Sequence, residues 1–135
     1  MLQKLLMFLK ETDCKILIKY DGERNSNKYT IKLLYNDLKR GSLGKDTDVP
    51  RDVIKDIFEN QDLFSAPNAL ELFLMISDSL IKVIESEFGM KSIISIMLEE
   101  KNSSVVYNLH LQTKDVTKHA SALSIEELIG IIFEQ

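Results

Sequence analysis

The apolar positions of the chain follow two periodicities, and each predicts a different kind of element. Helical spacing predicts a first helix over residues 2–11, from the apolar residues Leu2, Leu5, Leu6 and Leu9. Alternation of apolar and polar residues then predicts one strand from Cys14 to Tyr20 and a second from Tyr29 to Tyr35. The polar residues 21–27 between them predict the turn of a hairpin.

The next stretch changes from alternation to glycine and charge, and residues 37–50 are predicted to form a loop. A second helix is expected to begin close to Pro50, with Asp48 as its candidate cap. The apolar face of this helix is predicted to be buried, and it consists of Val53, Ile54, Ile57 and Phe58.

The second half of the chain repeats these elements. A third helix is predicted from Asn68 to about Phe88, and its apolar residues cover nearly every side, so it is either a buried spine or the seam of a dimer. Residues 94–98 and 105–111 alternate and predict a second hairpin. Ser124 and Glu127 have the spacing of a capping box, which predicts a final helix.

These elements predict one α+β domain over residues 1–135, with the order α-β-β-α-α-β-β-α. Four antiparallel strands with one apolar face each should form a sheet that carries its helices on that face. The opposite face is expected to be polar and open. Open sheet faces and edges are where such folds bind partners, although a merely solvated face is the more common outcome.

The two halves also match residue by residue. Residues 1–37 align with residues 79–115 at an offset of 78, and residues 53–59 align with 128–134 after a slip of three positions. The pattern predicts two repeat arms, 1–60 and 79–135, related by a pseudo-twofold axis on one sheet. Two arms with a shared pattern but no common origin would give the same alignment.

Charge divides the chain unevenly. The net charge is −4; residues 1–60 hold 12 Lys and Arg against 10 Asp and Glu (+2), and residues 61–135 hold 5 against 11 (−6). An acidic half disfavours nucleic acid as a partner and suits a basic protein, because complementary fields speed association. The same charge is also typical of a solvated surface. Apolar runs are too short for a membrane span, and a single cysteine fits the cytoplasm.

The residue types that could carry catalysis or bind a ligand are few and lie apart in the sequence. Gly44-Lys45 follows a strand, but Asp46 stands where a phosphate-binding loop needs Ser or Thr. Cys14 alternates in phase with the apolar residues of its strand and is expected in the core. His110 is placed on a strand face and His119 in the loop that follows it, with no close ligand to complete a metal shell.

The acidic cluster Asp46, Asp48 and Asp52 lacks the glycine and glutamate of a calcium loop and is expected to favour a helix N-terminus instead. We therefore expect no catalytic residue, no metal and no cofactor. A non-enzymatic function is the expectation that follows.

Two stretches resemble known families. Residues 28–35 and 44–54 form a strand, a charged turn and a short amphipathic helix, and with the size, acidity and α+β pattern of the chain they resemble small bacterial immunity proteins of contact-dependent inhibition and related toxin systems. This resemblance implies a cytoplasmic protein that binds and neutralises one toxin domain, often a basic nuclease. An inhibitor of that kind needs a complementary surface and no catalytic group.

The alternative resemblance is to type III secretion chaperones, which are small, acidic, dimeric α+β proteins. It is carried by residues 49–58 and by Asp62-Leu63-Phe64 after them, although the second long helix departs from the usual order of that family. Either function makes the chain a protein-binding module, as a monomer or a homodimer. The predicted contact residues are the acidic positions of the second arm: Glu85, Glu87, Glu99, Glu100, Glu126 and Glu127.

Overall fold

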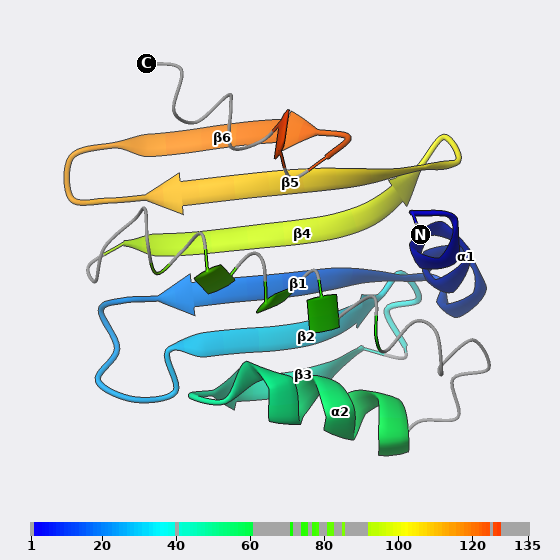
Figure 1. Cartoon of the computed structure of the whole chain (residues 1–135), viewed down its shortest axis with the longest axis horizontal. Helices are drawn as coiled ribbons and strands as arrows, with labels where there is room; N and C mark the ends of the chain where they lie inside the picture. Colours follow the sequence, from blue (N-terminus) through cyan, green and yellow to red (C-terminus); the bar gives the residue numbers. More distant parts are fainter. Residues whose placement is uncertain are drawn as a thin grey trace.

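The structure, a computed structural model, contains one six-stranded antiparallel sheet with helices on one of its faces (Figure 1). It describes residues 2–39, 41–60, 71, 74, 75, 77, 78, 81, 82, 85, 92–124, 126 and 127. Two helices have complete bounds, α1 (Leu2–Thr12) and α2 (Pro50–Asn60). The strands are β1 (Cys14–Asp21), β2 (Tyr29–Tyr35), β3 (Ser42–Thr47), β4 (Ile93–Lys101), β5 (Ser104–Gln112) and β6 (Thr117–Ala122). Their order across the sheet is β3-β2-β1-β4-β5-β6.

The predicted four-stranded sheet is therefore wrong, because a third strand extends each predicted hairpin at its outer side. β3 occupies part of the predicted loop 37–50, and β6 contains His119, which was also placed in a loop. Both are edge strands with one neighbour each, and most of their residues are exposed. An edge strand exposed in this way can consist of glycine and polar residues, so the apolar alternation that reveals an inner strand is missing.

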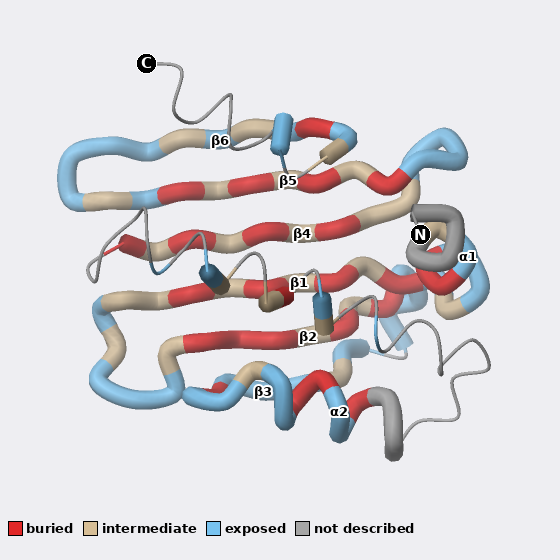
Figure 2. Tube along the Cα trace, in the orientation of Figure 1, coloured by how far each residue is buried: buried red, intermediate tan, exposed pale blue. Residues whose placement is uncertain are grey.

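The four inner strands bury every second residue, as their alternation predicts, and Figure 2 shows the resulting bands of buried residues. The buried side chains of all four strands join one core with α1 and α2. α1 contributes Phe8 and Leu9, which are 0% and 2% exposed. α2 buries Val53, Ile54 and Ile57, which confirms three of the four predicted positions, while the side chain of Phe58 lies outside the described residues.

The start of α2 differs from the prediction. Asp48 does not cap the helix, because its Oδ1 accepts a hydrogen bond from the Lys28 backbone N–H of the β1–β2 loop, 3.2 Å away. Instead, the Val49 N–H donates to Thr47 Oγ1 at 2.9 Å, and Pro50 is the first residue of the helix, where its missing N–H has no consequence.

Helical residues between 71 and 85 cross the same face of the sheet as α1 and α2 (Figure 1). Leu74 and Ile81 pack against the core and Ser77 is fully buried, with its hydroxyl donating to the Leu74 carbonyl at 3.0 Å. Met75, next to Leu74, is 50% exposed. Leu74, Ser77 and Ile81 thus form a stripe that faces the sheet, while the predicted ends of this helix lie outside the described residues. No helix among the described residues is both long and apolar enough to span a membrane.

The strand registers relate the two halves of the sheet by simple arithmetic. Adding 78 to both members of the β1–β2 pair Ile16↔Leu33 gives the β4–β5 pair Ile94↔Leu111. The β2–β3 pair Tyr29↔Thr47 becomes the β5–β6 pair Tyr107↔Ala122 when 78 is added to the first member and 75 to the second. The chain between the paired positions of β2 and β3 is therefore three residues longer than the chain between those of β5 and β6.

The pseudo-twofold relation is centred on the pairing between the halves. β1 pairs with β4, and Ile18 stands opposite Ile96, its own counterpart at the offset of 78. Each half is thus a three-stranded meander, not the predicted hairpin. True duplication and a shared pattern without common origin both stay open as interpretations.

Candidate binding surface

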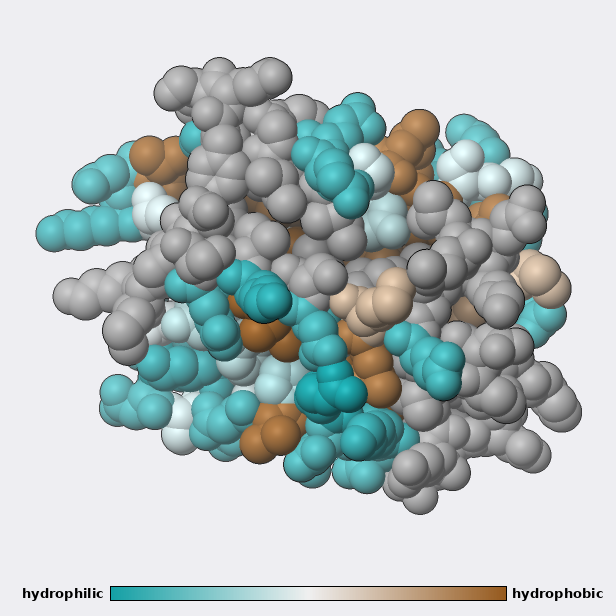
Figure 3. Space-filling view, in the orientation of Figure 1, coloured by the Kyte–Doolittle hydropathy of each residue, from teal (hydrophilic) through white to brown (hydrophobic). Residues whose placement is uncertain are grey.

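The face of the sheet opposite the helices is the candidate site, and we call it the open face. In the orientation of Figure 3 the helix-bearing side is in front, so the open face lies behind it. Its side chains alternate with the core residues along each strand. They are Lys15, Leu17, Lys19 and Asp21 on β1; Thr30, Lys32 and Leu34 on β2; Ser42, Gly44 and Asp46 on β3; Ile93, Ser95, Met97 and Glu99 on β4; Val106, Asn108, His110 and Gln112 on β5; and Thr117, His119 and Ser121 on β6.

An apolar band crosses the middle of the open face. Leu17 on β1 stands directly opposite Met97 on β4. The band continues diagonally to Leu34 on β2 and Val106 on β5, since these pair with the residues two positions from Leu17 and Met97. All four side chains are half-buried. The band therefore spans the four inner strands and joins the two halves of the sheet.

A polar chain crosses four strands and interleaves with the band, because Lys15 and Glu99 stand between Leu34 and Val106. Lys15 Nζ lies 3.4 Å from Glu99 Oε2, and Asn108 Nδ2 donates to Glu99 Oε1 at 3.0 Å. Ser121 Oγ then donates to Asn108 Oδ1 at 2.7 Å. Each side chain orients the next, so this part of the open face presents fixed hydrogen-bonding groups.

At the β3 corner, a second network centres on Arg24 of the β1–β2 loop. Its guanidinium group lies 3.3 Å from both Asp21 Oδ2 and Asp46 Oδ2. The Thr30 hydroxyl, in a residue only 5% exposed, donates to Asp46 Oδ1 at 2.5 Å and accepts from Arg24 Nη1 at 3.3 Å. The hydrogen bond from Thr30, together with the charges of Arg24 and Lys32, holds the pKa of Asp46 below its ordinary value of 3.8.

At the other edge of the sheet, the two histidines of the chain meet across β5 and β6. His110 and His119 are a directly opposed pair, with Nδ1 atoms 3.0 Å apart and rings in edge-to-face contact. Sequence reasoning missed this pair because it placed His119 in a loop. The available signal was weak: residues 117–122 follow the β3 residues 42–47 at the offset of 75, and neither segment alternates between apolar and polar residues.

Cys14 lies on the core face, opposite to the face that carries His110, and the two belong to strands separated by β4. Cys14 is 2% exposed, and its Sγ lies 3.0 Å from Thr12 Oγ1. Because the Thr12 hydroxyl donates its proton to the Phe8 carbonyl at 2.6 Å, the thiol is the donor in the contact with Thr12. The expected core position of Cys14 is confirmed.

A hollow opens at the end of the sheet where α1 leads into β1. Charged and polar side chains dominate its lining, which includes Lys10, Asp13, Lys15, Asn36, Glu99 and Glu100. The lining groups are tied to one another or to neighbours: Asn36 Nδ2 donates to Asp13 Oδ1 at 2.8 Å, and Lys10 Nζ donates to Ser103 Oγ at 3.1 Å. This hollow brings together Glu99 and Glu100 of the six predicted contact residues.

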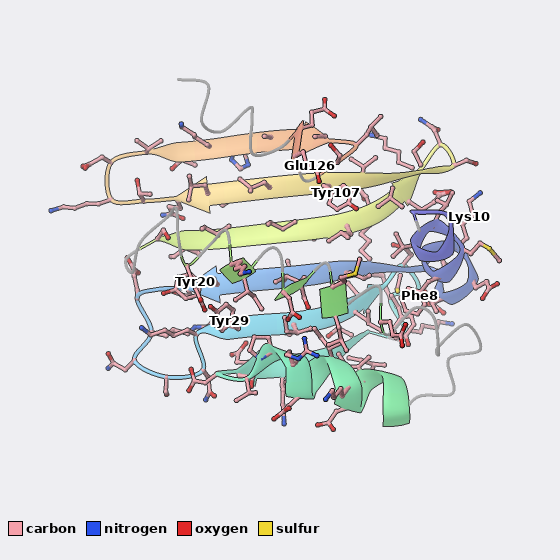
Figure 4. All side chains as sticks on the ribbon, viewed as in Figure 1. Phe8, Lys10, Tyr20, Tyr29, Tyr107 and Glu126 are labelled. Atoms are coloured by element: carbon pink, nitrogen blue, oxygen red, sulfur yellow. The ribbon has the colours of Figure 1, made fainter. Side chains whose placement is uncertain are left out.

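The other predicted contact residues lie apart. Glu85 accepts a hydrogen bond from the Tyr29 hydroxyl at 2.9 Å, and burial together with this carboxylate raises the pKa of Tyr29. Glu126 lies beside Tyr107 (Figure 4), whose pKa is raised by burial and by the Glu126 charge. Glu87 lies outside the described residues.

Glu127 belongs to the predicted capping box. Its N–H donates to Ser124 Oγ at 3.1 Å, and its Oε2 accepts from the Leu123 N–H at 3.3 Å. One of the two hydrogen bonds of the capping box is therefore present, while the glutamate side chain accepts from Leu123 instead of Ser124. The rest of the predicted last helix lies outside the described residues. Glu85, Glu99 and Glu127 are all engaged in contacts within the protein, so a basic partner would compete with these contacts.

Comparisons with known proteins add no identification. No protein-family model matches the sequence, and the searches of curated proteins and of solved structures gave no match either.

Proposed function

We propose that the protein is a non-enzymatic binding module that neutralises a toxin domain by forming a stoichiometric complex, and that the open face is its binding surface. The observation that carries this proposal is the apolar band of Leu17, Leu34, Met97 and Val106 on the face that bears no described helix. Half-buried apolar side chains interspersed with oriented polar groups have the mixed composition of a protein–protein interface.

The surroundings of the band support recognition of a folded partner. The polar chain from Lys15 to Ser121 offers hydrogen-bonding groups at fixed positions among and next to the apolar residues of the band. Lys19, Lys32 and the Arg24 network offer charge on the other half of the face. Complementary polar and charged groups at a rim set orientation and specificity, while the apolar centre supplies affinity.

The experiment compares two double variants with the wild-type protein. Leu17→Arg with Met97→Arg places two charges in the band. Val49→Arg with Met75→Arg makes the same chemical change at two half-exposed apolar positions on the helix-bearing side, and serves as the matched control. Each protein is used to capture its partner from the native cell, and the retained protein is identified and tested for toxicity when expressed alone.

We expect a one-to-one complex for the wild type and the control, and rescue of cells that express the partner. Loss of the band should weaken binding by at least about thirtyfold, as for a hot spot of about 2 kcal/mol. Equal binding by both double variants would exclude the open face as the surface. A stable dimer that binds an unfolded segment would support the secretion-chaperone alternative instead.

The six acidic residues remain a separate prediction about the same function. Glu100 and Glu126 give the sharpest test, because reversal at Glu85, Glu99 or Glu127 would also remove contacts inside the protein. Glu100→Lys with Glu126→Lys should weaken binding of a basic partner and should leave the melting temperature nearly unchanged. Unaltered affinity would remove the electrostatic part of the proposal and leave the open-face part standing.

A further inference from the structure

The pair formed by His110 and His119 has the arrangement of two ligands for one ion. The Nδ1 atoms are 3.0 Å apart, and the ring centroids are 4.2 Å apart. A hydrogen bond between two imidazole nitrogens contains a single proton, so one Nδ1 donates and the other offers a lone pair. The two nitrogens thus already face each other across the register of β5 and β6.

The separation between these atoms agrees with coordination geometry. Imidazole nitrogens bind Zn²⁺ at about 2.0–2.1 Å, and two such bonds at angles between about 90° and 109° place the nitrogens roughly 2.9–3.4 Å apart. We propose that His110 and His119 form a bidentate site for a divalent transition-metal ion, with Cu²⁺ as the ion bound most tightly. Cu²⁺ heads the affinity order for nitrogen ligands and favours the 90° arrangement.

Binding requires a small change in the protein and is balanced in protons. The proton between the rings moves to Nε2 of its own ring through solvent, which leaves both Nδ1 lone pairs available on neutral imidazoles. The rings then turn about their Cβ–Cγ bonds so that the lone pairs converge. Two metal–nitrogen bonds replace two metal–water bonds, and water keeps the other positions, because the described residues gather no third His, Cys, Asp or Glu there.

Among the described residues, the neighbours of the pair on the open face carry no charge that would repel a cation. The same-face neighbours of the two histidines by register and sequence are uncharged: Ser95, Asn108, Gln112, Thr117 and Ser121. Lys118 pairs with Leu111 and therefore points to the other face, and Lys19 is separated from His110 by β4. The site is accessible because His119 is exposed on an edge strand.

Metal binding would tie the edge strand β6 to β5. An ion that binds only the folded protein stabilises it by mass action, by about 2.7 kcal/mol at a concentration one hundred times its Kd. We therefore expect Cu²⁺ to raise the melting temperature and to slow amide exchange in residues 117–122.

Histidine-dependent binding can be assigned to this pair because the chain contains no other histidine. Cu²⁺ binding to the full chain is measured by calorimetry and by electron paramagnetic resonance, for the wild type and for His110→Ala, His119→Ala and the double variant. A second ligand on one ion acts as an intramolecular event, so each single variant should lose at least about tenfold in affinity. The double variant should also lose the weaker binding that a single remaining imidazole provides.

A matched control keeps two histidines and separates them. Lys118→His combined with His119→Ala moves one imidazole to the opposite face, and it should bind Cu²⁺ no more tightly than His119→Ala alone. Binding equal to that of the wild type would show that affinity follows histidine number, and would overturn the proposal. Melting temperatures without metal verify folding, and His119→Gln provides a second removal of the ligand should the alanine variant unfold.

Discussion

At the scale of single residues, the two neighbouring aspartates Asp46 and Asp48 stabilise the same loop through different partners. Asp46 accepts from Thr30 and pairs with Arg24, whereas Asp48 accepts from the backbone of Lys28. These hydrogen bonds favour the ionised carboxylates, and the pKa of each lies below its ordinary value of 3.8. Asp46 and Asp48 were predicted to favour a helix N-terminus, but they stabilise the β1–β2 loop instead.

The lowered pKa of Asp46 leads to a pH-dependent contribution to stability. A carboxylate whose pKa is lower in the folded state adds stability above its unfolded value of 3.8, and this addition is lost as the pH falls through the folded value. Asp46→Asn keeps an acceptor for Thr30 but removes the charge. Urea unfolding at several pH values should therefore show a deficit for the variant at pH 7 that shrinks below pH 3.8; a deficit of constant size would contradict this assignment.

At the scale of elements, the edge strands show what the sequence could and could not predict. The inner strands alternate because one of their faces is sealed in the core, and that pattern predicted β1, β2, β4 and β5 with bounds close to those observed. β3 and β6 have little buried surface, so pairing with β2 and β5 is all that defines them. The β3 residue Leu43 is only half-buried, and Gly44 would ordinarily mark a loop.

The same reason explains what was missed in the candidate sites. The apolar band was only partly visible in the sequence, because Leu17, Leu34 and Val106 occupy positions of the alternation that are ordinarily polar. The histidine pair depends on the β5–β6 register, which no local pattern records. A contact made by an edge strand that lacks apolar alternation can be predicted only when the order and register of the strands are known.

Gly44 gives a test of the β2–β3 pairing. Its φ of +121° is disfavoured for other residues, and an added Cβ would stand 2.0 Å from the Ile31 carbonyl oxygen. Gly44→Ala should therefore destabilise the protein by about 3 kcal/mol or more, from backbone strain and overlap combined.

Gly41 is the matched control for this substitution. Its φ is also positive, at +71°, but an added Cβ would meet nothing within 4 Å. Gly41→Ala should destabilise by only about 1 kcal/mol, the strain of the left-handed backbone alone. Chemical unfolding of both variants measures the difference, and equal losses would show that β3 does not pair closely with β2.

At the scale of the whole molecule, the pairing of β1 with β4 makes one sheet from two meanders. The core residues of both meanders belong to a single cluster, and α1 packs against β1, β4 and β5, thereby contacting both halves. The register puts Ile18 and Ile96, 1% and 3% exposed, side by side at the centre. The two halves are therefore expected to unfold together.

Substitution at this central pair tests that expectation. Ile18→Ala and Ile96→Ala should each lower the free energy of unfolding by about 2–5 kcal/mol, because both leave a cavity in the same core. Amide hydrogen exchange should accelerate in β2 and in β5 for either variant. Acceleration confined to the half that carries the substitution would mean that the halves are separate cooperative units.

The central pairing also differs from the other four in the length of chain that it closes. β1–β2, β2–β3, β4–β5 and β5–β6 each join consecutive strands across short connections, but β1 meets β4 only after residues 22–92. The entropic cost of closing a loop grows with the logarithm of its length. Pairing β1 with β4 therefore costs about 2 kcal/mol more in closure entropy than closing the seven-residue β1–β2 loop. We therefore expect the pairing of β1 with β4 to be the late step of folding, with the apolar faces of both meanders exposed to solvent until it forms.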